Sequence, residues 1–308
     1  MKKIILFTVI IIFIPFVVVT FFKVDKKEEI KLNYESNTII RVKRLSSSEI
    51  EYLPFEEYIV GVLAGEMPIY FEKEALKAQA VAARSYALKK IEYNKDNEYD
   101  VVDSVLNQVY LDNQYLKEAW GNKYVDNINK LREVVNDTSL EYLDYNGEVI
   151  DALFFSTSNG YTENSSLVFN IDLPYLQSVT SMWDSSTSSS FKCTKKISSS
   201  DFYSSLGLEK SNTLNFKVLK RSSTNRILNL NINGTDFTGR ELYDKLGLKS
   251  TDFSLKQDGD TIIIDTVGYG HGVGMSQYGA EGMALEGYSY KDILSHYYVG
   301  TSIKKLLN

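Results

Sequence analysis

Hydrophobic residues are unevenly distributed along the chain, and the longest uninterrupted run lies at the N-terminus. Residues 4–22 contain no charged side chain, and lysines stand on both sides of them. As a helix, this run would extend about 28 Å, close to the thickness of the hydrocarbon core of a bilayer. Its last residues, VTFF, lack the small side chains of a signal-peptide cleavage site. We therefore expect one transmembrane anchor over residues 1–23 and a polar spacer over 24–37, with a cleaved signal peptide as the alternative.

A helical period marks the segment Glu74–Tyr93 most clearly. Apolar residues recur there at helical spacing and form one stripe, composed of Leu76, Ala80, Ala83, Ala87 and Ile91. The small residues of this stripe allow close packing against a neighbouring element, and Arg84 lies off the stripe. Further helices are expected over 55–63 and 118–135, and after the capping-box patterns that begin at Thr238 and Ser289.

Strand and turn signals alternate with these helices. A strand is expected at Thr38–Val42, and residues 185–205 are rich in serine, which favours a loop or the edge of an insertion. Three dipeptides are typical of tight turns between antiparallel strands: Asn146-Gly147, Asn233-Gly234 and Asp258-Gly259. Because hairpins and helices follow one another irregularly, the pattern favours an α+β fold over a doubly wound sheet. We expect one domain over 38–308, with about 185–250 as a candidate inserted subdomain.

Composition and charge exclude several classes of function. The chain has 308 residues and a formal net charge of −6, and no run of Lys or Arg exceeds two residues, so nucleic acid is not an expected partner. A single cysteine, Cys193, permits neither an internal disulfide nor a cysteine-based zinc cluster. The two histidines are 25 positions apart (296 − 271), and the sequence contains no P-loop, G-x-S-x-G or H-E-x-x-H motif. We expect neither a cofactor nor a metal.

Carboxylates are the remaining candidates for chemistry. Glu66 lies in the apolar stretch LAGEMPIYF, and apolar surroundings raise the pKa of a carboxyl towards the range of a general acid. The alternative is an exposed turn residue. In the polar stretch Ser156–Ser166, STSNGYTENSS, the side chains of Ser156, Thr157 and Ser158 are suited to bonding sugar hydroxyls or an N-acetyl group. Glu163 is a second candidate carboxylate there, and an ordinary polar turn is the alternative.

Three long motifs together resemble one known family. They are FEEYIVGVLAGEMP…EALKAQAVAARSYAL, FFSTSNGYTENS…LPYLQSV and GYGHGVGMSQYGAEGMALEGYSYKDILSHYY. In this order they closely resemble the stage II sporulation protein D family, part of the wider SpoIID/LytB domain, from about Thr38 to the C-terminus. The resemblance implies a membrane-anchored lytic transglycosylase that cuts peptidoglycan glycan strands during engulfment of the forespore. It also implies an amidase partner that strips the stem peptides, and other engulfment proteins of the membrane.

The resemblance also assigns roles to individual residues. The catalytic glutamate of the family falls on Glu66, the arginine of its A-A-R-[ST]-Y helix on Arg84 and the tyrosine of its P-Y-L-K motif on Tyr175. The lysine of that last motif is replaced by Gln177 here. Relatives often carry zinc-binding cysteine and histidine in segments where this chain has other residues, namely Val102, Leu106, Asn107 and Phe155.

A single acid is enough for the implied reaction. A lytic transglycosylase uses no water, so one residue, Glu66, can serve first as acid and then as base, whereas hydrolysis by the usual route needs two carboxylates. Arg84 is expected to orient Glu66 or hold substrate, with a structural ion pair as the alternative. The glycine-rich loop Gly268–Ala280 is expected to form a wall of the glycan cleft, with His271, Ser276, Gln277 and Tyr278 as substrate contacts. A buried, structural His271 is the alternative. The rival functions are a non-catalytic glycan-binding scaffold that activates an amidase, and a hydrolase that uses Glu66 with Glu163.

Overall fold

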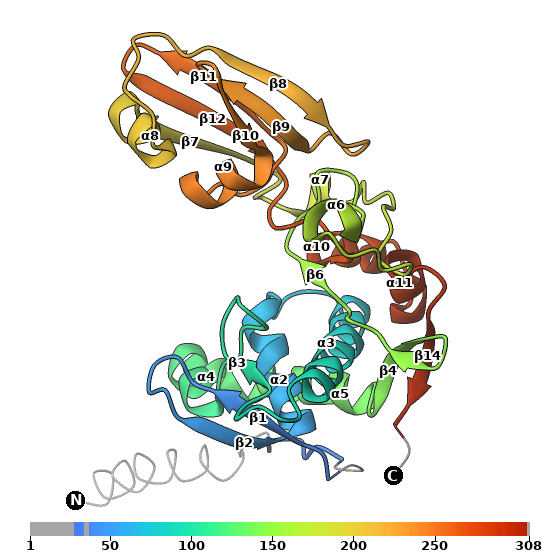
Figure 1. Ribbon diagram of the computed structural model, residues 1–308. Helices are drawn as coiled ribbons and strands as arrows, with labels where there is room; N and C mark the ends of the chain where they lie inside the picture. The colour runs from blue at the N-terminus through green and yellow to red at the C-terminus, as the bar shows by residue number, and fades with distance from the viewer. Residues whose placement is uncertain (1–27, 34–36, 307–308) are drawn as a thin grey trace, which may run out of the picture.

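The computed structural model describes residues 28–33 and 37–306, so the predicted anchor lies outside the described residues. Within the described part of the chain, no helix is both long enough and apolar enough to cross a bilayer. The fold is α+β, as predicted, with small and mostly antiparallel sheets among the helices. Figure 1 shows a larger lower part, rich in helices, and an upper lobe composed mainly of strands.

A three-stranded sheet opens the lower part. Strand β1 (Ile39–Lys43) pairs antiparallel with β2 (Ile50–Pro54) and parallel with the short β3 (Val101–Val102). Ile40 and Val42 of β1 are both buried, because alternate residues of a strand face the same side. The strand expected at Thr38–Val42 is therefore confirmed, shifted by one residue.

Helix α3 is central to the lower part. The helices of this part are α2 (Phe55–Glu66), α3 (Lys73–Tyr93), α4 (Asn113–Trp120) and α5 (Tyr124–Asp137). The predicted apolar stripe of α3 packs into the core that it shares with α2 and α5. Its opposite face, which includes Ala78 and Val81, is buried in a second core. The single helix predicted over 118–135 is wrong, because the backbone turns at Gly121 (φ 52°) and a 3₁₀ turn separates α4 from α5.

The second core joins the middle of the chain to its C-terminal part. Its elements are β4 (Glu141–Tyr145), β5 (Glu148–Val149), β6 (Phe154–Phe155), α6 (Ser165–Phe169), α7 (Asp184–Thr187), β13 (Met275–Ser276), α10 (Gln277–Leu285), α11 (Tyr290–Tyr297) and β14 (Ser302–Lys305). Strands β4 and β5 form the hairpin predicted at Asn146-Gly147, and β14 returns to pair with β4. The predicted capping box at Ser289 opens α11. Strand β13 pairs parallel with β6, which brings residues 154–158 beside the glycine-rich loop and α10.

The upper lobe has a hydrophobic core of its own. Its elements are β7 (Lys192–Ser198), α8 (Ser199–Leu206), β8 (Phe216–Arg221), β9 (Ile227–Ile232), β10 (Thr235–Thr238), α9 (Gly239–Leu246), β11 (Phe253–Asp258) and β12 (Thr261–Val267). They form two antiparallel three-stranded sheets with α8 and α9 beside them (Figure 1), and the core residues include Phe202, Leu230 and Ile262. Both turns predicted here and the helix after Thr238 are confirmed.

Of the two interpretations of residues 185–205, a loop or the edge of an insertion, the loop is wrong. This segment contains most of α7, all of β7 and most of α8. Strand β7 pairs with β12 along its whole length, and Phe202 of α8 is buried in the core of the upper lobe. Long-range pairing and burial therefore outweigh the local preference of serine for loops.

Candidate functional site

Glu66 is the last residue of α2, and two distant segments hold its carboxylate. The backbone N–H of Val109 donates to Oε1 at 2.6 Å, and the side-chain amide of Gln277 donates to Oε2 at 3.3 Å. The neighbouring Gly65 makes this approach possible, because a Cβ there would lie 2.5 Å from the carbonyl oxygen of Val109. The side chain is partly buried, so Glu66 is not the exposed turn residue of the alternative interpretation.

Burial raises the pKa of Glu66, and the hydrogen bonds from Val109 and Gln277 oppose the rise without cancelling it. The direction predicted from the apolar flanks is confirmed. Desolvation disfavours the charged carboxylate, so a larger fraction of Glu66 remains protonated near neutral pH than for an exposed glutamate. This is the state that a general acid needs before it donates its proton.

One tyrosine near the carboxylate is Tyr86, and another, Tyr278, follows Gln277 in the chain. Burial, with a contribution from Glu66, raises the pKa of Tyr86 to about 12, and the side chain of Asn107 donates to the Tyr86 hydroxyl at 3.0 Å. On the surface, Tyr70 is 71% exposed and its side chain is hydrogen-bonded to that of Tyr278. The side of the site towards solvent thus presents aromatic rings with polar tips, which are suited to stacking on sugars.

Arg84 does not contact Glu66. Its guanidinium is completely buried and binds both carboxylate oxygens of Glu56, at 2.9 and 2.7 Å, while Nη1 donates to the carbonyl oxygen of Glu141 at 2.9 Å. These bonds tie α3 to α2 and to β4. Arg84 lies off the apolar stripe yet is buried because α3 is covered on both faces. The geometry supports the ion-pair alternative, and the expectation that Arg84 orients Glu66 has no supporting contact.

The glycine-rich loop packs against the protein itself. Gly272 and Gly274 have φ angles of 86° and 81°, which favour glycine. A Cβ at Gly272 would lie 2.6 Å from the guanidinium of Arg226, and one at Gly274 would lie 1.9 Å from the carbonyl oxygen of Leu153. The glycines therefore allow the loop to approach neighbouring protein atoms closely.

His271 is a packing residue in this loop. Its Nδ1 accepts a hydrogen bond from the backbone N–H of Val273 at 3.1 Å, and the ring also bonds the backbone of Phe154. It packs against the rings of Phe155 and Phe169. Burial lowers its pKa to about 4, so the ring is neutral at pH 7. These contacts agree with a structural His271, whose side chain is partly rather than fully buried, and no described contact links it to Glu66.

A buried carboxylate, Asp184, gathers several of the other expected substrate contacts. It accepts hydrogen bonds from the backbone N–H of Ser158 (2.7 Å) and from the hydroxyls of Ser158 (2.9 Å), Ser181 (2.6 Å) and Ser276 (2.5 Å). Ser158 and Ser276 are completely buried, and Thr157, 1% exposed, bonds Ser188. These hydroxyls are used within the protein, so the expectation that they bind substrate is not supported.

Two further expected contacts also have internal partners. Tyr175 is buried, and its hydroxyl accepts a hydrogen bond from the backbone N–H of Asp151 at 3.2 Å. The carbonyl oxygen of Ser156 accepts from the backbone N–H of Tyr278 at 3.1 Å, so Ser156 positions the start of α10. Of the residues proposed from the sequence, the structure brings Gln277 to Glu66 directly and Tyr278 to the nearby surface. The sequence did not indicate the role of the Val109 N–H, because nearly every residue carries a backbone donor of this kind.

Comparison with known proteins identifies the family. A family model described as "Stage II sporulation protein" (SpoIID) matches residues 43–145. Stage II sporulation protein D of Bacillus subtilis (strain 168) is 42% identical over 272 residues, which cover 86% of this chain and 79% of that protein. The chain belongs to the stage II sporulation protein D family. The protein of the same name from Bacillus amyloliquefaciens is 41% identical over 277 residues, which cover 88% of this chain and 80% of that protein.

A more distant relative of this SpoIID chain is the "Amidase enhancer" of Bacillus subtilis (strain 168). It is 32% identical over 297 residues, which cover 79% of this chain and 40% of that longer protein. The family shown by these matches is thus one of sporulation.

This SpoIID protein differs from the metal-binding pattern expected for some relatives. Among residues 28–33 and 37–306, no group of three or more His, Cys, Asp or Glu side chains could hold a metal ion. One of the substituted positions, Asn107, instead accepts a hydrogen bond from the N–H of Val102 at 2.9 Å and donates to Tyr86. These bonds fix the segment that carries the Val109 N–H to Glu66.

Proposed function

We propose that this protein is a lytic transglycosylase that cleaves the bond between N-acetylmuramic acid and N-acetylglucosamine in peptide-stripped glycan strands. The observation that carries the proposal is Glu66, a partly buried carboxyl with a raised pKa that is held by two hydrogen-bond donors. Neither of its described bonding partners is a carboxylate. One such acid suits a reaction that needs no second carboxylate.

The proton on Glu66 moves twice in this reaction. Protonated Glu66 donates to the glycosidic oxygen as the bond from that oxygen to C1 of the muramyl residue breaks. The C6 hydroxyl of the same residue then attacks C1 and returns its proton to Glu66, which leaves a 1,6-anhydro ring and restores the acid. The hydrogen bonds from Val109 and Gln277 stabilise the intervening carboxylate, because donors favour the charged form.

The proposal also covers location and partners. The apolar run of residues 4–22 anchors the protein as a single-pass protein of the mother-cell membrane, with the catalytic domain outside the cytoplasm and facing the forespore. The substrate is the glycan strand of peptidoglycan, and an amidase removes its stem peptides first. Other engulfment proteins of the membrane are the expected neighbours.

The test is the substitution Glu66→Gln, which keeps the shape of the side chain but removes the transferable proton. We expect the variant to fold, to bind peptide-stripped strands and to form 1,6-anhydro ends about 10²–10⁴-fold more slowly, the usual contribution of general acid–base catalysis. Mass spectrometry of the digested strands measures the new ends. Glu72→Gln, at an exposed carboxylate six positions after Glu66 in the chain (72 − 66), is the matched control, and we expect it to keep wild-type activity. Near wild-type cleavage by Glu66→Gln refutes the mechanism.

The similarity to the amidase enhancer supports a second candidate, a glycan-binding scaffold that activates an amidase without cutting the strand. In that case the wild-type protein yields no new glycan ends but increases the rate of peptide release by the amidase. A hydrolase that uses Glu66 with Glu163 has less support, because Glu163 is 1% exposed and bonded to the hydroxyl of Thr224. Free reducing ends without anhydro sugar would favour the hydrolase.

A further inference from the structure

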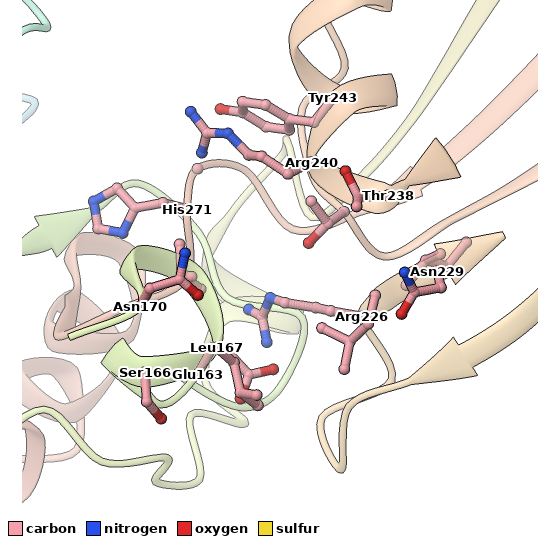
Figure 2. Close-up of a pocket in the computed structure, with 15 residues that line it drawn as sticks. Glu163, Ser166, Leu167, Asn170, Arg226, Asn229, Thr238, Arg240, Tyr243 and His271 are labelled. Atoms are coloured by element: carbon pink, nitrogen blue, oxygen red, sulfur yellow. The ribbon is translucent and has the colours of Figure 1, made fainter. Parts of the chain in front are cut away.

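A cavity of about 420 Å³ lies between the upper lobe and the segment of α6, within the size range of small-molecule sites. Figure 2 shows its walls: Glu163 and Asn170 on the side of α6, Arg226 and Asn229 beside and along β9, and Arg240 and Tyr243 on α9. His271 and Gly270 of the glycine-rich loop also line it. Glu66 and its two donors are not among the lining residues, so this cavity is distinct from the Glu66 site.

One wall of the cavity is a fixed and internally neutral group. Glu163 and Arg226 are 1% and 3% exposed. The hydroxyl of Thr224 donates to Glu163 and accepts from Nη1 of Arg226 at 2.9 Å, and Nη2 of Arg226 donates to the carbonyl oxygen of Tyr161 at 3.1 Å. The opposite charges therefore balance one another through one hydroxyl, and this wall keeps its shape whether or not the cavity holds a ligand.

Arg240 supplies the charge that remains available to a ligand. Its Nε bonds the exposed Asp244 at 2.9 Å, and its guanidinium stacks on the ring of Tyr243 at 4.9 Å. Among the described residues, no hydrogen bond occupies the two terminal nitrogens of Arg240. A surface pair such as Arg240–Asp244 is weak, so it competes little with an incoming anion. Arginine with its terminal nitrogens free is well suited to binding both oxygens of a carboxylate.

The remaining lining residues are suited to a sugar ring. The ring of Tyr243 and the side chains of Leu167 and Ile227 offer apolar surface, while the amides of Asn170 and Asn229 offer both donors and acceptors. We propose that this cavity binds a sugar residue with a free carboxylate, and that Arg240 contacts the carboxylate. On the proposed function this residue is N-acetylmuramic acid, whose lactyl carboxylate is free only after the stem peptide has been removed.

Binding to a non-cleaving protein tests the inference. In the Glu66→Gln background, calorimetric titrations compare N-acetylmuramic acid with N-acetylglucosamine, which lacks the lactyl carboxylate. We expect about a tenfold or greater preference for N-acetylmuramic acid, since a hydrogen-bonded charge contributes about 1.5–3 kcal/mol. Arg240→Gln should remove the preference. Lys245→Gln, which removes the same charge from an exposed position of the same helix outside the cavity lining, should retain it.

Equal affinity for the two sugars, or an unchanged preference in Arg240→Gln, overturns the inference. The inference is also overturned if Lys245→Gln loses the preference together with Arg240→Gln, because a general charge effect would then explain the binding. These titrations do not depend on cleavage. If wild-type protein makes no anhydro ends but the preference follows Arg240, the cavity assignment stands and the transglycosylase proposal fails.

Discussion

Removal of the Arg84 guanidinium separates a structural role from a catalytic one. Arg84→Met leaves Glu56, which is 3% exposed, without its two hydrogen bonds and leaves the carbonyl oxygen of Glu141 without one of its donors. Loss of one partner from a buried ion pair costs about 3–5 kcal/mol. Since 1 kcal/mol shifts the melting temperature of a domain of about 150–250 residues by about 2–4 °C, we expect a decrease of roughly 6–20 °C.

The matched control removes both charges. In the double variant Glu56→Leu/Arg84→Met, no unpaired charge remains buried, so we expect most of the lost melting temperature to return. Thermal unfolding followed by circular dichroism measures stability, and formation of anhydro ends is assayed well below the lowest melting temperature. We expect both variants to cut glycan under those conditions. An Arg84→Met protein with a wild-type melting temperature but no activity would refute this reasoning and return Arg84 to the catalytic machinery.

Three further outcomes follow from the site. Gln277→Leu removes a hydrogen bond that lowers the pKa of Glu66, so the high-pH limb of the kcat/KM profile should move to higher pH; a shift to lower pH would contradict the assignment. Gly274→Ala should greatly lower the melting temperature, because its Cβ would meet the carbonyl of Leu153. Gly287→Ala has a similar φ but open space and should cost only about 1–3 kcal/mol of backbone strain; equal losses would refute the steric argument. Treatment with a chelator should leave the rate of cleavage unchanged, and a loss restored by zinc would show a metal requirement.

The features that could be predicted from the sequence are those that depend on neighbouring residues. Each turn at an Asn-Gly or Asp-Gly pair depends on the φ angles of two residues. Each capping box depends on hydrogen bonds within a stretch of four residues. The direction of the pKa shift of Glu66 was predictable because its neighbours in the sequence are apolar, which favours burial. In contrast, Val109 and Gln277 lie 43 and 211 positions from Glu66, and no local pattern indicates that they meet there.

Whether a polar side chain is buried was the other feature that the sequence did not predict. The hydroxyls of Ser158 and Ser276 resemble exposed sugar contacts in the sequence, yet both bond Asp184, the first residue of α7, which lies directly before the serine-rich segment. In the folded protein, four hydrogen bonds from three serines compensate the cost of burying the charge of Asp184. A small hydroxyl residue therefore does not reveal from its type alone whether its partner is a ligand or the protein.

The glycine-rich loop connects the two candidate sites within one short segment. His271 lines the cavity and Gln277 bonds Glu66, only six positions later in the chain (277 − 271). Between them, Gly272 lies against Arg226 and Gly274 against Leu153, and the ring of His271 is itself bonded to the backbone. Because neither glycine position has room for a side chain, the path of the backbone is fixed, and the amide of Gln277 is held beside the acid before any substrate arrives. On the proposed function, the loop contributes to catalysis by positioning Gln277, and a neutral, partly buried His271 helps to hold the loop in place.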